Sequence, residues 1–478
     1  MVPVYNAILI SWAESGSKEA PLRGQALIER IWKVYDEDSG RNSNVKPDVS
    51  NYNQLLMSLN SKHEGFEHQA EALLKEMKRR NVKPNAKTYF SALALLARAG
   101  RGKEAQEILE AAIQEYLDGN NDIRPSNVWF NSVMDAWAKS RSPDAPNRAG
   151  AVLSKMLELS DQLKTRPDVI SYNILIDCWA KSSQKDAASR AEAVLRDLQE
   201  KRISGAQNLV PNAFSYTSVI NAWARQGDAS RAEAVLEEMY KDYQSGNELA
   251  KPEAVPFNSV LNAWARSRSP DAPDRAKSIL SRMWELCDRF ETRPDNVSYN
   301  ILIDCWAKSG RKDSALQAEA VLRDVQKMHD SGVKDILPNA VIYTSVINAW
   351  AQNGDGPRAE ALLEEMYEDY KNGNMSAKPT VQAYGAVLNA WARSGSPHAP
   401  DRAEAILSKL LELSDQFGCQ PDATSFYAFI ECWAKSNRKD ASKRIEASLQ
   451  DMRKRNINLD ESIVSNIRPL CQRLEDPK

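Results

Sequence analysis

Residues 171–182 read SYNILIDCWAKS, and residues 298–309 repeat the same twelve letters 127 positions later. Within the stretch, Tyr172, Leu175, Ile176 and Trp179 lie at i, i+3, i+4 and i+7. This spacing is typical of one apolar face of an α-helix. A recurrence at a fixed distance indicates a repeat architecture. The stretch therefore predicts one helix of a helical repeat.

Weaker copies of the stretch occur along the whole chain. They begin at residues 4, 51, 88, 129, 215, 256, 342, 383 and 425. Each copy is followed by a second amphipathic segment, such as RAEAVLEEMYKDY, and then by proline with a small polar residue. One helical hairpin cannot bury its own apolar face, but stacked hairpins can. We therefore predict an all-α fold, a right-handed α-solenoid of about eleven helix-turn-helix repeats.

The repeat boundaries suggest a history of duplication. The predicted units are residues 2–48, 49–85, 86–126, 127–168, 169–212, 213–253, 254–295, 296–339, 340–380, 381–422 and 423–460. Units four to six and units seven to nine span the same length. The predicted organisation is 1–126 for repeats one to three, 127–253 for four to six, 254–380 for their duplicate, 381–460 for ten and eleven, and 461–478 for a C-terminal capping segment.

The composition narrows the classes of function. Hydrophobic residues make up 42% and charged residues 27%, as in ordinary globular proteins. No run of eighteen apolar residues occurs, which argues against a membrane span. The net charge of −2 argues against nucleic-acid binding by bulk charge alone. The opening MVPVYNAILI shows no basic stretch before an apolar run and starts almost directly on the helical pattern. We therefore expect a fragment or a truncated gene model, from which a targeting peptide is missing.

Cysteine and tryptophan are expected to fill the core. No CxxC pair occurs, and Cys178, Cys305 and Cys432 occupy one repeated position, which favours small buried thiols. Nine tryptophans occupy the eleventh position of a unit, on the predicted apolar face. We interpret them as contacts between hairpins, and base stacking is the alternative.

The opposite face of the first helix carries a polar stripe. Residues at i, i+4 and i+8 lie on one side of a helix. In the unit that starts at residue 169 these are Asn173, Asp177 and Lys181. An amide or hydroxyl recurs first, and a cation recurs two turns later. A solvated surface would mix polar residues freely, so the order favours a polymeric ligand with one base and one phosphate per step.

The order Val-x-Tyr-Asn-x-Leu-Ile-Asp-x-x-x-Lys, an amphipathic helix and then Pro-Asp or Pro-Asn resembles the pentatricopeptide repeat over residues 2–460. The resemblance implies binding of single-stranded RNA in an organelle, about one base per repeat. It implies RNA stabilisation, processing or translation, with recruited protein factors as further partners. The mitochondrion is the expected location, and the chloroplast is the alternative.

The resemblance also assigns residues. The fifth and last residues of a repeat would read the base: Asn6, Asp48, Asn53, Asn85, Asn131, Asp168, Asn173, Asn212, Thr217, Glu253, Asn258, Asp295, Asn300, Asn339, Thr344 and Thr380. The second residue would stack on it: Val128, Ile170, Phe214, Val255, Val297 and Val341. The cations would meet phosphates: Arg98, Lys139, Lys181, Arg225, Arg266, Lys308, Arg393 and Lys435.

In the family, Asn with Asp tends to select U and Asn with Asn tends to select C. The array would then prefer roughly 5′-UCNUCNUCNNN-3′. Repeats of 41–44 residues exceed the usual family length, so this code is a hypothesis for the present chain.

Two other classes of function compete with RNA binding. A protein-interaction scaffold of the tetratricopeptide type also consists of helical hairpins, but its motif lacks the Tyr-Asn and Pro-Asp pattern. An enzyme is not expected, because the four histidines show no zinc spacing and one acid per hairpin cannot form a tight metal cluster. We expect no cofactor, no metal and no small-molecule substrate.

Overall fold

The computed structural model describes residues 2–457 apart from residues 16, 18, 38–45, 60–68, 207, 291, 334, 418–419, 437 and 456. These residues form α-helices and three short 3₁₀-helices, and no strand occurs among them. The chain divides into two compact units, residues 1–226 with 234–251 and residues 227–233 with 252–478. The predicted capping segment, 461–478, lies outside the described residues.

The first unit is built from consecutive helix pairs. Its helices are α1 (Val2–Glu14), α2 (Ala20–Glu37), α3 (Val49–Leu59), α4 (Gln69–Arg79), α5 (Ala86–Ala99), α6 (Gly102–Leu117), α7 (Asn127–Lys139), α8 (Ala145–Glu158), the short α9 (Ser160–Leu163), α10 (Val169–Lys181), α11 (Ala187–Ile203) and α12 (Ala213–Gln226). The unit boundary falls within α13 (Ala229–Gln244).

The second unit continues the same order. Its helices are α14 (Ala254–Ser267), α15 (Ala272–Phe290), α16 (Asn296–Lys308), α17 (Ser314–Asp330), α18 (Ala340–Asn353), α19 (Gly356–Lys371), α20 (Val381–Ser394), α21 (Ala399–Phe417), α22 (Ala423–Ala434) and α23 (Ala441–Lys454).

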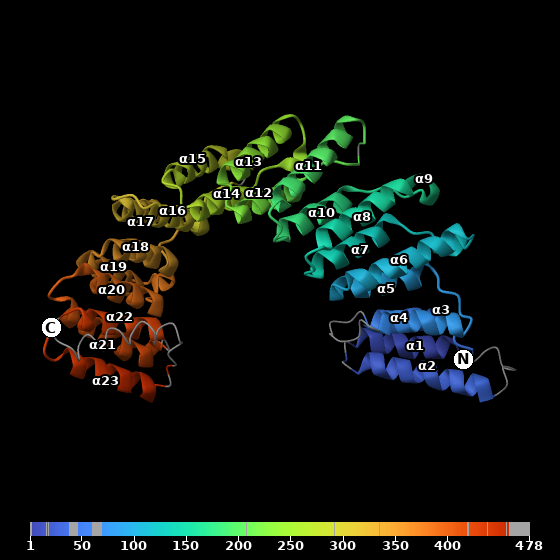
Figure 1. Cartoon of the computed structure of the whole chain (residues 1–478), viewed down its shortest axis with the longest axis horizontal. Helices are drawn as coiled ribbons and strands as arrows, with labels where there is room; N and C mark the ends of the chain where they lie inside the picture. The colour runs from blue at the N-terminus through green and yellow to red at the C-terminus, as the bar shows by residue number, and fades with distance from the viewer. Residues whose placement is uncertain are drawn as a thin grey trace. The chain divides into compact units, whose positions relative to one another are not determined.

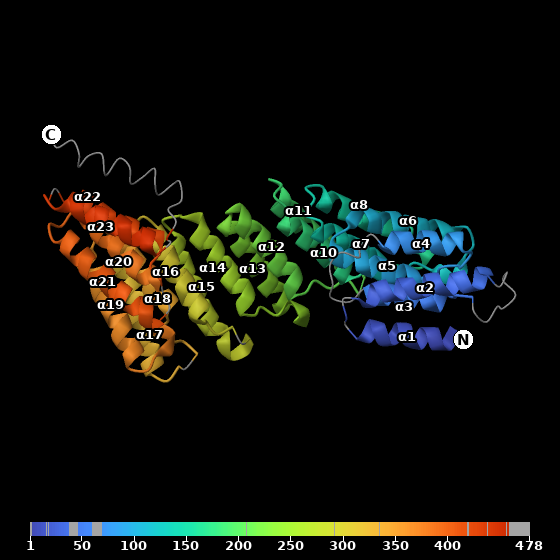
Figure 2. The ribbon, with the colours of Figure 1, turned by 90° about the horizontal axis from the view of Figure 1, so that it is seen from below.

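Within each unit the first helices of successive pairs form one layer and the second helices form another (Figures 1 and 2). In the first unit α5 packs on α7, α7 on α10, and α10 on α12. In the second unit α14 packs on α16, α16 on α18, α18 on α20, and α20 on α22. Eleven helix pairs are present in the described chain, so the predicted all-α solenoid of about eleven repeats is confirmed.

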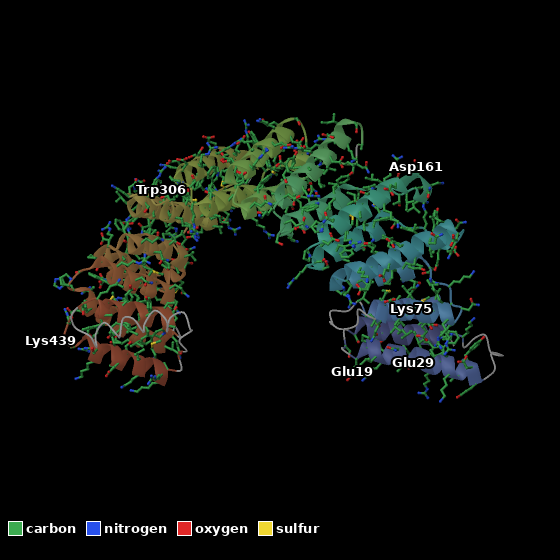
Figure 3. All side chains as sticks on the ribbon, viewed as in Figure 1. Glu19, Glu29, Lys75, Asp161, Trp306 and Lys439 are labelled. Atoms are coloured by element: carbon green, nitrogen blue, oxygen red, sulfur yellow. The ribbon has the colours of Figure 1, made fainter. Side chains whose placement is uncertain are left out.

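The core lies between the two layers. The fourth position of the first helices contributes fully buried rings, such as Tyr172, Tyr216 and Tyr343. The eleventh position contributes the repeated tryptophans, and Trp306 and Trp433 are almost completely buried. Figure 3 labels Trp306 among the helices of the second unit and Lys75 on α4, where the Lys75 side chain is 74% exposed. Burial of these rings stabilises each hairpin only through its neighbours.

Several tryptophans also make a polar contact between repeats. Trp350 Nε1 donates to Glu319 Oε2 at 2.9 Å, and the Glu319 carboxylate also accepts hydrogen bonds from Arg358. The same arrangement recurs one repeat later, where Trp391 Nε1 donates to Glu360 Oε2 at 2.9 Å. A buried carboxylate is stable only with such partners, so this contact fixes the indole within the core.

The extra length of the repeats has a local structure. Three 3₁₀-helices, η2 (Asn121–Ile123), η3 (Glu248–Ala250) and η4 (Met375–Ala377), follow second helices at intervals of 127 residues. Asn120, Asn247 and Asn374 cap them through side-chain oxygens. Asn374 Nδ2 also donates to the carbonyl of Pro338 at 2.7 Å, which ties the insertion to the preceding repeat. The added residues are therefore ordered parts of the hairpin.

None of the helices in the described part of the chain combines the length and the apolar character needed to cross a membrane.

Candidate nucleic-acid interface

The fifth and last residues of a repeat meet at the start of the following helix. Asn131 on α7 donates from Nδ2 to Asp168 Oδ1 at 3.2 Å. Asp168 precedes α10 and accepts from the backbone N–H of Ser171 at 2.9 Å, as an N-cap does. The Ser171 hydroxyl lies 2.6 Å from Asn131 Oδ1 and 3.0 Å from Asp168 Oδ1. The three side chains therefore form one network between two repeats.

The network recurs in the next repeat of the first unit. Asn173 Nδ2 lies 3.2 Å from Asn212 Oδ1, and the Ser215 hydroxyl lies 2.6 Å from Asn173 Oδ1. Earlier in the chain, Asn53 Nδ2 donates to Asn85 Oδ1 at 3.3 Å. Two hydrogen bonds orient the Asn173 amide plane, as they do in Asn131. Asn53 Oδ1 is instead buried without a hydrogen-bond partner among the described residues.

The second unit retains only part of the network. The Ser298 hydroxyl donates to Asn258 Oδ1 at 2.7 Å, and the Ser345 hydroxyl lies 3.2 Å from Asn300 Oδ1. Asn258 and Asn300 are half-buried, whereas Asn131 and Asn173 are 8% exposed. The fifth-position amides are thus less exposed than an outward-facing stripe implies, because the next repeat covers them.

The last residue of a repeat has a second task as a helix cap. Side-chain oxygens of these residues accept from the backbone N–H three positions later: Asp48, Asn85, Asp168, Asn212, Asp295, Asn339 and Thr380. Glu253 precedes α14 without a side-chain cap hydrogen bond. The proline before the cap, as in Pro167 and Pro294, restricts the residue that precedes it to an extended conformation, so the second helix of one repeat cannot continue into the next repeat. The repeated Pro-Asp or Pro-Asn therefore has a structural role besides any readout.

The remaining fifth-position residues differ in their contacts. Thr217 and Thr344 bond back to the carbonyls of Ala213 and Ala340 in their own helices, at 2.7 and 2.6 Å. Asn6 on α1 donates to the Ser50 hydroxyl at 3.2 Å. The threonine hydroxyls therefore have a partner within the repeat, as is common for threonine inside helices.

The eight predicted phosphate-binding cations are all exposed at the ends of first helices. The lysines are nevertheless paired with an acid one turn earlier: Lys139 with Asp135, Lys181 with Asp177, Lys308 with Asp304, and Lys435 with Glu431, at 2.5–2.7 Å. The middle residue of the stripe is thus a counter-ion. Sequence reasoning left its role open, although the Asp-to-Lys spacing of four residues is the signal for such a pair.

Three of the four arginines in this set have an asparagine, and not an acid, one turn earlier on the same helix. Arg225, Arg266 and Arg393 follow Asn221, Asn262 and Asn389. Arg225 donates to the carbonyl of Ala180 in the preceding repeat at 3.1 Å. The lysines of the stripe therefore have a counter-ion on their own helix, whereas Arg225 has a backbone acceptor in the preceding repeat.

Family models of three kinds match the chain. The "Pentacotripeptide-repeat region of PRORP" matches residues 282–431, the "Pentatricopeptide repeat domain" matches 38–93 and 72–140, and the "PPR repeat" matches 207–240. These segments lie in both units and carry the helix pairs described above. The chain belongs to the pentatricopeptide-repeat family.

A solved structure of a pentatricopeptide-repeat protein shares the fold. PPR10 from maize matches with a TM-score of 0.61 and 23% identity, over 97% of this chain and 60% of that chain. PPR10 in complex with an 18-nt psaJ RNA element matches with a TM-score of 0.44 and 22% identity, over 98% of this chain and 61% of that chain. The present pentatricopeptide-repeat chain therefore spans about three fifths of the length of PPR10. No curated protein matches it.

The second position of pentatricopeptide repeats four to nine is apolar and solvent-exposed. The exposed fraction is 48% for Val128, 56% for Ile170, 53% for Phe214, 61% for Val255, 53% for Val297 and 53% for Val341. Each lies in the first turn of its helix, beside the N-cap residue that precedes the helix. Each of the two units thus has three apolar side chains at one repeated exposed position, which provide surfaces for flat ligand groups.

The cysteines at the repeated position after the motif aspartate are structural. Cys178, Cys305 and Cys432 are buried and free, and burial raises the pKa of each thiol to about 12. Such thiols are weak nucleophiles and weak metal ligands. Within the described residues, no group of three His, Cys, Asp or Glu side chains could hold a metal ion. Cys419 and Cys471 lie outside those residues.

Proposed function

We propose that the chain binds single-stranded RNA along the row of first helices and selects it by sequence, about one base per repeat. The exposed apolar residues at the second position carry this proposal. An exposed Ile170 or Phe214 gains no free energy of burial while it stays in water, but a stacked base would remove it from water. Membership of the pentatricopeptide-repeat family supports the same conclusion.

The chemistry of readout follows from the network beside each exposed apolar residue. Asp168 offers only acceptor oxygens, whereas Asn212 at the equivalent position also offers an amide donor. Uracil presents an N–H at the centre of its pairing edge, and cytosine presents a lone pair there. An Asp in the last position thus favours U, and an Asn favours C, which yields the expected pattern 5′-UCNUCNUCNNN-3′.

The cations supply affinity that does not depend on sequence. Lys181 and Lys308 stand two helical turns from the reading amide, where a phosphate would exchange places with the Asp counter-ion. An exposed pair of this kind is worth only about 0.3–0.5 kcal/mol, so the exchange is inexpensive. Affinity from phosphate contacts falls as salt concentration rises.

The biological action that we propose is passive. An array bound to a transcript would block nucleases or a competing hairpin, or recruit protein factors, and would thereby affect RNA stability, processing or translation. The mitochondrion is the proposed location, with the chloroplast as the alternative. The chain would act as a binding protein and not as an enzyme.

The experiment that tests the proposal is selection from a random single-stranded RNA pool on the immobilised chain. Enrichment of UC dinucleotides spaced by one nucleotide is expected. Fluorescence anisotropy with the pool 5′-UCNUCNUCNNN-3′ should then give tighter binding than with a pool in which A replaces U and C, in the presence of heparin. Selection without any spaced pattern would exclude sequence readout. Failure to bind RNA at low salt would instead favour the protein-interaction scaffold.

A further inference from the structure

A recess of about 510 Å³ lies between the fourth and fifth repeats, at the end of the first helices. Its polar lining comes from the ends of α7 and α10 and from the turns that follow them: Lys139, Arg141, Ser142, Lys181, Ser182 and Ser183. The volume is in the range of about 300–1,000 Å³ that is typical of small-ligand sites. Two of the predicted phosphate-binding lysines therefore share one concave surface with a third cation.

The charges in the recess favour an anion. Lys139 and Lys181 are each paired with one Asp on their own helix, at 2.6 and 2.5 Å. The Arg141 side chain forms no ion pair within the described part of the chain, and it is exposed. One uncompensated guanidinium remains beside the hydroxyls of three serines. A guanidinium with nearby hydroxyl donors is well suited to a phosphate group.

The backbone at Arg141 points to a purpose for this side chain. Arg141 has φ = 55°, and Arg268 at the equivalent position of the duplicated repeat has φ = 52°. The tenth repeat has glycine there, Gly395 with φ = 63°, and a side chain added at Gly395 would meet no atom within 4 Å. Glycine adopts this left-handed conformation without strain, whereas arginine does not. Two repeats thus keep a strained arginine where glycine fits.

Hydrogen bonds from the next repeat hold the turn in place. Gln184 Nε2 donates to the carbonyl of Pro143 at 2.8 Å, across the recess from one turn to the next. The Ser140 and Ser142 hydroxyls close the turn by accepting from backbone N–H groups at 3.3 Å. The backbone that carries Arg141 is therefore held in place before any ligand binds, which reduces the part of the entropic cost that comes from ordering the turn.

We propose that this recess binds a backbone phosphate of single-stranded RNA between the fourth and fifth repeats. Arg141 is the phosphate-binding residue contributed by the elongated turn, and Arg268 serves the same role in the duplicated seventh repeat. The proposal rests on the proposed function, which supplies the RNA. It assigns an additional row of phosphate-binding residues to the turn between the two helices, beyond the row on the first helices.

The test uses Arg141→Gly and Arg268→Gly in the full chain, with the RNA pool 5′-UCNUCNUCNNN-3′. Each substitution relaxes backbone strain, so the melting temperature should stay the same or rise. RNA affinity should fall by roughly threefold to tenfold, and the slope of log K against log salt should decrease by about 0.7 for each phosphate that the variant no longer neutralises. Base preference in the selected pool should not change.

The reciprocal variant provides a gain of function. Gly395→Arg introduces into the tenth repeat the cation that the fourth and seventh already have, so affinity and salt slope should rise. The phosphate site would be overturned if Arg141→Gly and Arg268→Gly left both the RNA affinity and its salt dependence unchanged while the wild type bound RNA normally. That result would leave the proposed function intact. A lower melting temperature in Arg141→Gly would overturn the phosphate site too, since Arg141 would then be structural. Absence of RNA binding by the wild type would overturn both proposals.

Discussion

Removal of the carboxylate beside a stripe lysine should strengthen RNA binding. Lys308 Nζ lies 2.6 Å from Asp304 Oδ2, and the two side chains are 42% and 39% exposed. A phosphate at about 2.8 Å from the ammonium would stand roughly 5.4 Å from that carboxylate. Two unit charges at this distance repel by about 0.8 kcal/mol in water, which is about fourfold in affinity. Asp304→Asn should therefore raise affinity about fourfold at low salt.

Screening gives the prediction a second signature. At physiological ionic strength the gain should shrink to about twofold, because the Debye length is then about 8 Å. Fluorescence anisotropy against the pool 5′-UCNUCNUCNNN-3′ at several salt concentrations measures both effects. Asp330→Asn, at the far end of α17, makes the same change in net charge and should have little effect. Equal effects of the two variants, or weaker binding by Asp304→Asn, would refute the assignment of Lys308 to a phosphate.

Three further predictions concern stability and readout. Glu319→Ala should lower the free energy of unfolding in urea by about 1–3 kcal/mol, because it leaves the half-buried Trp350 N–H without its acceptor and the Arg358 guanidinium without this counter-ion. The exposed Glu368→Ala should cost under about 0.5 kcal/mol, and equal losses in the two variants would contradict the prediction. Ser215→Ala should loosen the Asn173 amide and blur base selection at one step without altering the salt slope, as sequencing of selected RNA would show. Burial raises the pKa of the Cys305 thiol to about 12, so in the folded chain it should resist thiol reagents at pH 8. Because the thiol of the unfolded chain ionises above about pH 8.5 and the buried thiol does not, the free energy of unfolding should decline as the pH rises above that value.

Most of the fold could be predicted from periodicity. The apolar spacing of Tyr172 and Trp179 is local information, and the recurrence of the stretch identifies the stacked hairpins. The 3₁₀-helices were not predicted, because a three-residue helix has no periodicity of its own. Their asparagine caps, such as Asn247, recur every 127 residues and could have revealed an ordered insertion.

The candidate site was harder to derive because its contacts cross between repeats. The family resemblance pairs Asn131 with Asp168, but the sequence does not reveal the Ser171 hydroxyl that orients the amide. The exposure of Val128 also depends on its neighbours, since a valine in a helix is more often buried. The assignments of bases and phosphates to individual residues remain predictions.

The double task of the last residue in each repeat limits how such an array can be reprogrammed. Asp168 is the last residue of the fourth repeat, where it orients the Asn131 amide. It also caps the first helix of the fifth repeat through Ser171. A designer who exchanges single repeats at the Pro-Asp boundary would cut through this arrangement. Segments for exchange should instead run from the middle of one first helix to the middle of the next, so that the amide, the cap and the serine travel together. Duplication of three whole repeats keeps the amide, the cap and the serine together at the boundaries inside the duplicated segment. It separates them only at the two ends of that segment.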